Sequence, residues 1–138
     1  MKKELNKKSD VVTVVIDVSF KDNIENVKHY IREEQCPLFY SFNDDGIIKF
    51  EWFLIEEDNT ATLIEVFKNS DVWEELGNKV IGSPINIRFR ELFEIEKLTV
   101  LGDINDSFRE KIQPMNPIIK TYVDNVFVSR CGTSSTSL

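Results

Sequence analysis

Apolar and polar residues alternate along residues 11–20, a stretch dominated by β-branched side chains. Every second residue from Val12 to Phe20 is apolar, whereas the positions between them include Thr13, Asp17 and Ser19. This alternation predicts a first strand with one apolar face.

The spacing of apolar residues becomes helical after this strand. Ile24, Val27 and Ile31 recur at intervals of three and four, after a capping-box-like pair formed by Asp22 and Glu25. A helix is therefore predicted to begin here. Its end stays open, because residues 37–42 fit either a second helical piece begun by the proline or a strand entering an Asp-Gly hairpin turn.

Residues 47–55 and 60–68 predict an antiparallel hairpin joined by the polar turn at residues 56–59. In the first strand one face carries Ile48, Phe50, Trp52 and Leu54. In the second strand Ile64 and Val66 share one face, and Leu63, Glu65 and Phe67 share the other. Glu51 and Glu65 thus interrupt strands that are otherwise largely apolar. The presence of a charged residue in each of these strands needs an explanation.

The remaining elements are read from capping signals and spacing. A helix is predicted from Ser70 and Asp71, because Asp71 and Glu74 have capping-box spacing. Residues 83–94 fit a helix or an alternating strand, and we expect the helix. A strand over residues 95–101, a short helix from Ser107 to Met115 and a last strand over residues 117–128 follow.

The order strand, helix, strand, strand, helix, strand predicts a ferredoxin-like α+β fold, an antiparallel sheet with helices on one face, followed by an extra helix and strand. We expect a single domain over residues 1–130 and a disordered tail of small polar residues over 131–138. The strongly apolar strand faces suit the side covered by helices. The opposite sheet face is then predicted to carry Asp17, Lys49, Glu51, Glu65, Lys97 and Thr99.

Composition excludes several classes of function. The net charge of −7 disfavours nucleic acid, and no stripe of basic residues offsets it. No apolar run approaches the length of a membrane span, and the basic N-terminus lacks the apolar segment of a signal peptide, so we expect a cytoplasmic protein. Cys36 and Cys131 lie far apart without a Cys/His cluster, which predicts reduced thiols and no structural metal site.

Three segments carry a family resemblance: FEWFLIEEDNTATLIEVFKNSDVWEEL, RFRELFEIEKLTVLGDINDSFREKI and VDNVFVSR. Together they resemble the antibiotic biosynthesis monooxygenase family of dimeric α+β barrels, over about residues 11–130. The resemblance implies a homodimer in which two sheets face each other. It also implies oxygenation of quinol-like or polycyclic aromatic substrates without metal, flavin or other cofactor. It favours a helix for residues 37–42.

The resemblance also suggests site residues. Cofactor-free oxygenation needs a base that forms a substrate carbanion, and Glu65 or Glu51 is the candidate. Substrate binding is assigned to Trp52, Phe67, Trp73 and Asn69. Many members carry a His on the helix after the IEVFKNSD segment, where this sequence has Glu75 and Leu76. The alternative for the two glutamates is pairing with Lys49 or Lys97 across the sheet, and for the two tryptophans it is simple core packing.

Two classes of function remain open from the sequence. One is a monooxygenase acting on a small aromatic substrate, and the other is a non-catalytic dimer that binds a small ligand or serves as a scaffold. In both, a sheet face carrying Phe53, Ile55, Leu63 and Phe67 is too apolar for water, which predicts a homodimer that buries it. Glu65 and Glu51 are then expected to look into the interior shared by the two sheets.

Overall fold

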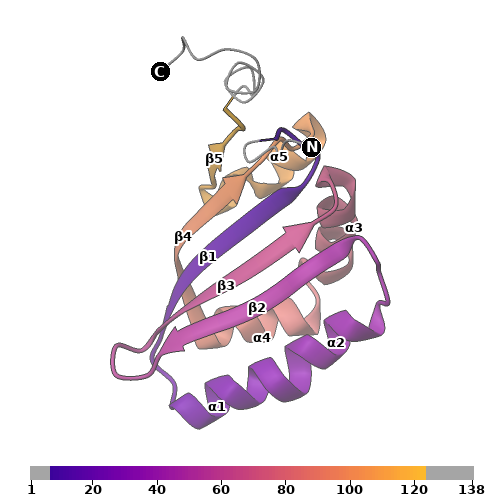
Figure 1. Cartoon of the computed structure of the whole chain (residues 1–138). Coiled ribbons are helices and arrows are strands. Elements are labelled where there is room, and N and C mark those ends of the chain that lie inside the picture. The colour runs from indigo at the N-terminus through magenta and orange to yellow at the C-terminus, as the bar shows by residue number, and fades with distance from the viewer. Residues whose placement is uncertain (1–6, 124–138) are drawn as a thin grey trace, which may run out of the picture.

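The computed structural model describes residues 7–123 of the chain. Its centre is a five-stranded sheet in the order β2-β3-β1-β4-β5 (Figure 1). The strands are β1 (Val12–Phe20), β2 (Ile47–Ile55), β3 (Thr60–Phe67), β4 (Phe93–Leu101) and β5 (Ile118–Lys120). The first four pair antiparallel and β5 pairs parallel with β4. The predicted ferredoxin-like α+β fold is confirmed, and β5 is the extra strand.

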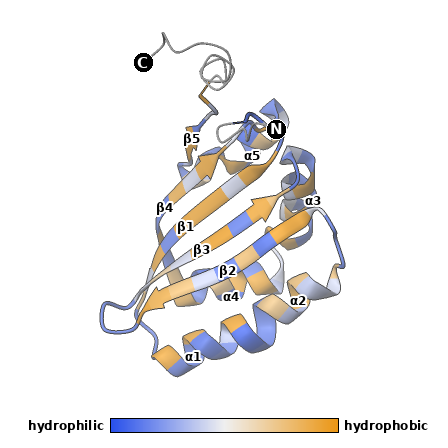
Figure 2. Cartoon of the chain, viewed as in Figure 1, coloured by the Kyte–Doolittle hydropathy of each residue, from blue (hydrophilic) through white to orange (hydrophobic). Residues whose placement is uncertain are grey.

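The helices of the described residues cover one face of this sheet and leave the other face bare (Figures 1 and 2). They are α1 (Ile24–His29), the π-helical η1 (Tyr30–Gln35), α2 (Cys36–Ser41), α3 (Ser70–Val80), α4 (Pro84–Leu92), α5 (Asp106–Ile112) and the 3-10 turn η2 (Gln113–Met115). Residues 37–42, which the sequence left open, therefore belong to a helix, and the helix expected within residues 83–94 is confirmed.

The π-helical η1 joins α1 and α2 into one continuous helix. Pro37 has no N–H for the bond to the carbonyl four residues earlier, and its ring would collide with that carbonyl in α-helical geometry. The chain widens instead, and the Cys36 N–H donates to the carbonyl of Ile31, five residues earlier. The proline that made this region ambiguous in the sequence is therefore accommodated without breaking the helix.

Three asparagines cap the helices α1, α3 and α5. The side chains of Asn23, Asn69 and Asn105 accept hydrogen bonds from the N–H groups of Asn26, Val72 and Phe108, respectively. Asparagine is among the best N-cap residues because its short side chain reaches the free N–H groups of the first turn. The helices were predicted correctly, but the capping residues themselves were not identified.

The register of β3 overturns one sequence prediction. Glu65 lies opposite Val14 of β1 and Phe50 of β2, and directly opposed residues share a sheet face. Since Val14 is fully buried beneath the helices, Glu65 points to the helix-covered face and not to the bare one. Leu63 and Phe67 share this face and are buried as well, so their predicted place on the bare face was also wrong.

The error has a physical reason. Apolar residues occupy both faces of β3, so the alternation fixes which residues share a face but not which face is covered. Pairing with β1 decides this. The bare face carries Glu51, Phe53, Thr62, Ile64 and Val66 from β2 and β3, and Asp17, Lys97 and Thr99 from β1 and β4.

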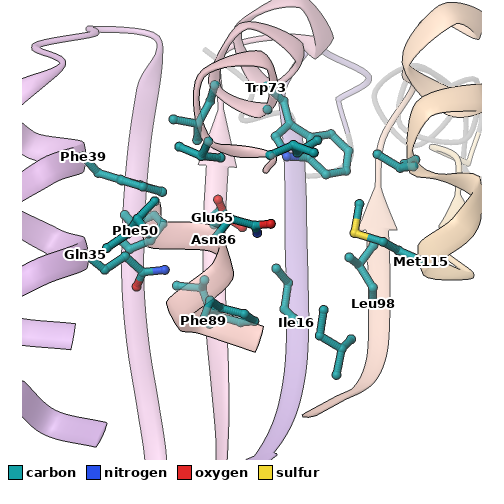
Figure 3. A pocket seen from close by; sticks show the side chains of 18 of the residues that line it. Ile16, Gln35, Phe39, Phe50, Glu65, Trp73, Asn86, Phe89, Leu98 and Met115 are labelled. Atoms are coloured by element: carbon teal, nitrogen blue, oxygen red, sulfur yellow. The ribbon is translucent and has the colours of Figure 1, made fainter. Parts of the chain in front are cut away.

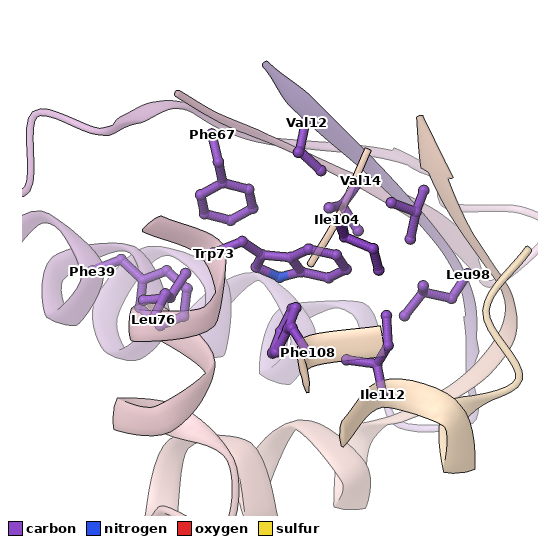
Figure 4. Close-up of a cluster of buried hydrophobic side chains, with 11 residues drawn as sticks. Val12, Val14, Phe39, Phe67, Trp73, Leu76, Leu98, Ile104, Phe108 and Ile112 are labelled. Atoms are coloured by element: carbon purple, nitrogen blue, oxygen red, sulfur yellow. The ribbon is translucent and has the colours of Figure 1, made fainter. Parts of the chain in front are cut away.

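Trp73 of α3 is the centre of one of the two hydrophobic clusters beneath the sheet (Figure 4). Its indole stacks on Phe67, with ring centroids 5.9 Å apart, and meets Phe108 of α5 edge-on at 4.6 Å. These contacts connect β3, α3 and α5. They hold α3 over the sheet, which matters below because α3 forms one wall of a cavity.

The C-terminal predictions are tested only in part. Of the strand expected over residues 117–128, the segment Ile118–Lys120 is β5, whereas residues 124–128 and the tail at 131–138 lie outside the described residues. Cys131 lies there too. Among residues 7–123, no helix combines the length and apolar character that crossing a bilayer requires.

Candidate functional site

A cavity of about 110 Å³ lies between the sheet and the helices (Figure 3). The continuous helix α1–η1–α2 borders it on one side, α3 and α4 lie against it, and α5 with η2 lies on the opposite side. Most of its wall is aliphatic or aromatic. The polar side chains in the wall belong to Tyr30, Gln35, Glu65, Asn86 and Arg90.

Glu65 is the buried acid of this cavity. The residue is 6% exposed, and within the described residues its carboxyl makes no hydrogen bond and no ion pair. Burial among apolar groups raises its pKa from the ordinary value of 4.5 to about 8. The group is therefore mainly protonated at neutral pH, and it is able to give or accept a proton within a modest pH range.

The carboxyl oxygens reach open space inside the protein. Among the described residues, every side-chain nitrogen or oxygen that is completely enclosed has a hydrogen-bond partner. Because Glu65 is buried, makes no polar contact and lines the cavity, its oxygens must face that cavity. In Figure 3, Glu65 lies in the middle of the lining side chains, with Phe50 on one side and Met115 on the other.

Gln35, at the end of η1, is the second buried polar side chain in the wall and is 5% exposed. Its Oε1 accepts a hydrogen bond of 2.8 Å from Nε1 of Trp52. Two further polar side chains of the wall bond to the backbone. The Tyr30 hydroxyl donates to the Ile85 carbonyl at 2.9 Å, and Asn86 Oδ1 accepts a long bond of 3.4 Å from the Gly82 N–H.

The structure separates the predicted site residues. Glu65 and Trp73 both line the cavity, whereas Trp52, Phe67 and Asn69 do not. Trp52 is linked to it through Gln35 and stacks on Phe93 with centroids 5.1 Å apart. Phe67 is fully buried against Trp73, and Asn69 caps α3.

Glu51 lies on the bare face of the sheet, exposed and away from the cavity. Among the described residues, neither glutamate forms the ion pair with Lys49 or Lys97 that was the structural alternative. Glu65 and Glu51 therefore belong to opposite faces and do not share one interior.

Sequence reasoning missed Gln35 and Asn86. Gln35 follows Tyr30 by five positions, and residues five apart diverge by about 140° around a regular α-helix. Nothing in a helical pattern would place them on one side. The one available signal was Pro37, which requires a local change of helix geometry.

The part of the chain that the structure describes contains no cluster of metal-ligating side chains. No group of three or more His, Cys, Asp or Glu side chains is placed to hold an ion. His29 is exposed on α1, with its Nε2 3.9 Å from Oε2 of Glu34.

Comparison with known proteins gives the fold. No protein-family model matches the sequence, and no curated protein does. Among solved structures, MupZ from Pseudomonas fluorescens matches with a TM-score of 0.68 and 14% identity, covering 84% of this chain and 93% of that one. SnoaB from Streptomyces nogalater, described as a cofactor-independent oxygenase and solved as a mutant, matches with a TM-score of 0.58 and 15% identity, covering 70% and 96%.

A third structure, the protein YJCS, matches with a TM-score of 0.51 and 17% identity, covering 69% of this chain and 99% of that one. At such identities the likeness concerns the arrangement of the chain. It confirms the ferredoxin-like α+β fold that the order of elements predicted. The described residues therefore have the ferredoxin-like α+β fold that these solved structures share.

Proposed function

We propose that this protein is a cofactor-independent monooxygenase that acts on a small quinol-like aromatic molecule bound in the Glu65 cavity. The observation that carries the proposal is a single carboxyl group, without an ion pair, facing an otherwise largely apolar cavity. The fold shared with SnoaB, itself described as a cofactor-independent oxygenase, supports the same reaction class.

The reaction needs one proton acceptor and a water-poor cavity. Glu65, in its ionised form, removes the proton from a substrate hydroxyl, and the electron pair moves into the ring. The electron-rich ring carbon forms a C–O bond with dioxygen, and protonation of the distal oxygen gives a hydroperoxide. Loss of water from that hydroperoxide leaves a quinone carbonyl, so one oxygen atom enters the product and the other becomes water. Dioxygen is reduced and the substrate is oxidised by four electrons.

The size of the cavity argues for a small substrate. An apolar protein cavity of about 150 Å³ holds benzene, and the cavity here is about 110 Å³. A single ring therefore fits after small movements of side chains, whereas a polycyclic aromatic requires the walls to separate. Among the substrates implied by the family resemblance, the single-ring quinols suit this cavity better.

The first test is oxygen uptake with a panel of single-ring and polycyclic quinols. We expect uptake with a single-ring member and its loss in Glu65→Gln, which keeps the shape of the side chain but removes the proton acceptor. Glu57→Gln, in the exposed turn between β2 and β3, is the matched control. Full activity of a folded Glu65→Gln variant would show that Glu65 is not the base.

Glu51→Gln belongs in the same experiment because the sequence made Glu51 the second candidate base. Glu51 lies on the bare face, so we expect this variant to retain oxygen uptake. Loss of oxygen uptake in Glu51→Gln would indicate that the active site lies on the bare face of the sheet and not in the Glu65 cavity.

A non-catalytic ligand-binding protein is the second candidate. The pKa of about 8 favours it, because Glu65 is mainly protonated at neutral pH and then acts as a hydrogen-bond donor to a bound ligand. Binding of a quinol in calorimetry without any oxygen uptake, from neutral to alkaline pH, would select this function over the oxygenase.

We further infer that the protein works as a homodimer. The bare sheet face exposes Phe53 by 55% and Ile55 by 49%, beside the partly buried Ile64 and Val66. A second copy of the same face would cover these side chains, as the family resemblance implies.

A further inference from the structure

We propose that Gln35 binds an oxygen atom of the ligand in the Glu65 cavity through its amide N–H, and that Trp52 is the positioning residue that fixes this amide. The proposal deepens the proposed function and rests on the part of it that assigns a small oxygen-bearing ligand to this cavity. It names a second contact to that ligand.

The first step concerns the orientation of the amide. The indole Nε1–H of Trp52 is only a donor, so the atom of Gln35 that faces it at 2.8 Å must be the carbonyl oxygen. The amide NH₂ of Gln35 is thereby turned away from Trp52. Figure 3 shows this nitrogen directed from the helix toward the middle of the cavity.

The second step concerns what the NH₂ meets. Gln35 is 5% exposed, and among the described residues the NH₂ has no hydrogen-bond acceptor. The nitrogen of this NH₂ is not completely enclosed by protein atoms, because every completely enclosed polar side-chain atom among the described residues has a hydrogen-bond partner. Since Gln35 lines the cavity, this donor opens into it. A buried donor of this kind gains most from a ligand that supplies an acceptor.

The third step concerns the backbone. The π-helical η1 places Tyr30 and Gln35 in the same cavity wall, although they lie five positions apart. In a regular α-helix their directions would differ by about 140°. The geometry imposed around Pro37 therefore aims the amide inward.

Together, Gln35 and Glu65 define the class of ligand. Gln35 offers a neutral donor, and Glu65 offers a carboxyl that exchanges a proton. An aromatic hydroxyl satisfies both groups when it loses its proton to Glu65, because the oxygen that gains negative charge accepts the amide hydrogen bond. A hydrocarbon of the same shape satisfies neither.

The test compares phenol with toluene, which replaces the hydroxyl by a methyl group. Binding to the whole 138-residue chain is measured by calorimetry under nitrogen, so that turnover plays no part. For Gln35→Met we expect roughly a tenfold or greater loss of phenol affinity, the size of one lost hydrogen bond. The affinity for toluene is expected to stay within about twofold.

Trp52→Phe is the matched variant. It removes the indole N–H that donates to Gln35 Oε1, but it keeps the glutamine side chain itself. We expect a smaller loss of phenol affinity than in Gln35→Met, since the amide is present but no longer held. Gln113→Leu, at an exposed position in η2, controls for glutamine removal elsewhere.

The outcomes separate this inference from the oxygenase proposal. Phenol binding that depends on Gln35 supports the inference even when no oxygen uptake is found. Equal losses for phenol and toluene, or equal losses in Gln35→Met and Trp52→Phe, would assign the pair a structural role and overturn it. Failure of the folded wild-type protein to bind phenol overturns it too. If Gln35→Met does not fold, an unchanged phenol affinity in Trp52→Phe contradicts the positioning role.

Discussion

The carboxyl of Glu65 is buried where ionisation is costly and where no cation among the described residues offsets the cost. In a chain selected only for stability, an apolar residue at this position would pack against Val14 and Phe50 without that cost. The register, and not any local sequence feature, brings the carboxyl under the helices. Its retention in the wall of a cavity is what makes it a functional candidate.

The raised pKa of Glu65 predicts a specific pH dependence of stability. Between pH 4.5 and about 8 the folded state keeps a proton on Glu65 that the unfolded chain releases, so the free energy of unfolding falls as pH rises. The stabilisation is complete below the unfolded pKa and lost above the folded one. Its upper limit is roughly 5 kcal/mol, at about 1.4 kcal/mol for each pKa unit.

Glu65→Gln isolates this contribution because glutamine does not titrate. Urea unfolding of both proteins at about pH 5 and about pH 9 should show the variant gaining stability relative to the wild type as pH rises. A constant difference between the two proteins across this range would mean that the carboxyl is not desolvated in solution.

At the scale of elements, asparagine caps account for where three of the helices begin. Asn69 caps α3, the helix that carries Trp73 into the cavity wall, through a 3.0 Å bond from the Val72 N–H to Oδ1. Its predicted role in substrate binding stays a prediction, but the cap gives it a structural role that is testable separately.

We expect Asn69→Ala to lower the free energy of unfolding by about 1 kcal/mol, and Asn69→Asp to preserve it, because aspartate caps equally well. Denaturant unfolding measures this effect, and phenol calorimetry on the same variants measures the predicted binding role. An Asn69→Ala variant with wild-type stability would contradict the cap, and a selective loss of phenol affinity would support substrate binding.

For the whole molecule, the bare sheet face is the surface through which we predict assembly. We expect a symmetric homodimer through this face, and Phe53→Glu to shift it to monomer by placing a charge among apolar side chains. Light scattering at micromolar concentration measures the mass. Ile87→Glu on α4 is the matched control, since Ile87 is 53% exposed against 55% for Phe53 but lies on the helical side. A monomeric mass for the wild-type protein would contradict the predicted dimeric barrel.

The order of elements, and with it the fold, follows from local patterns in the amino-acid sequence. Period-two alternation in β1 and β2, helical spacing after Asp22 and after Ser70, and the polar turn at residues 56–59 are local signals, and each of these elements is present in the structure. Local signals suffice here because backbone geometry alone sets these periods.

In contrast, the buried side of β3 and the set of side chains that meet in the cavity depend on contacts between distant parts of the chain. Glu65 and Trp73 lie eight positions apart, whereas Gln35 comes from a helix thirty residues before Glu65 and is turned inward by the π-helical geometry around Pro37. Alternation shows that neighbouring residues point to opposite faces of the sheet, but not which of the two faces is buried. Strand pairing and helix packing decide which face is buried. For the same reason Glu51 and Glu65, equivalent in the sequence pattern, lie on opposite faces of the sheet.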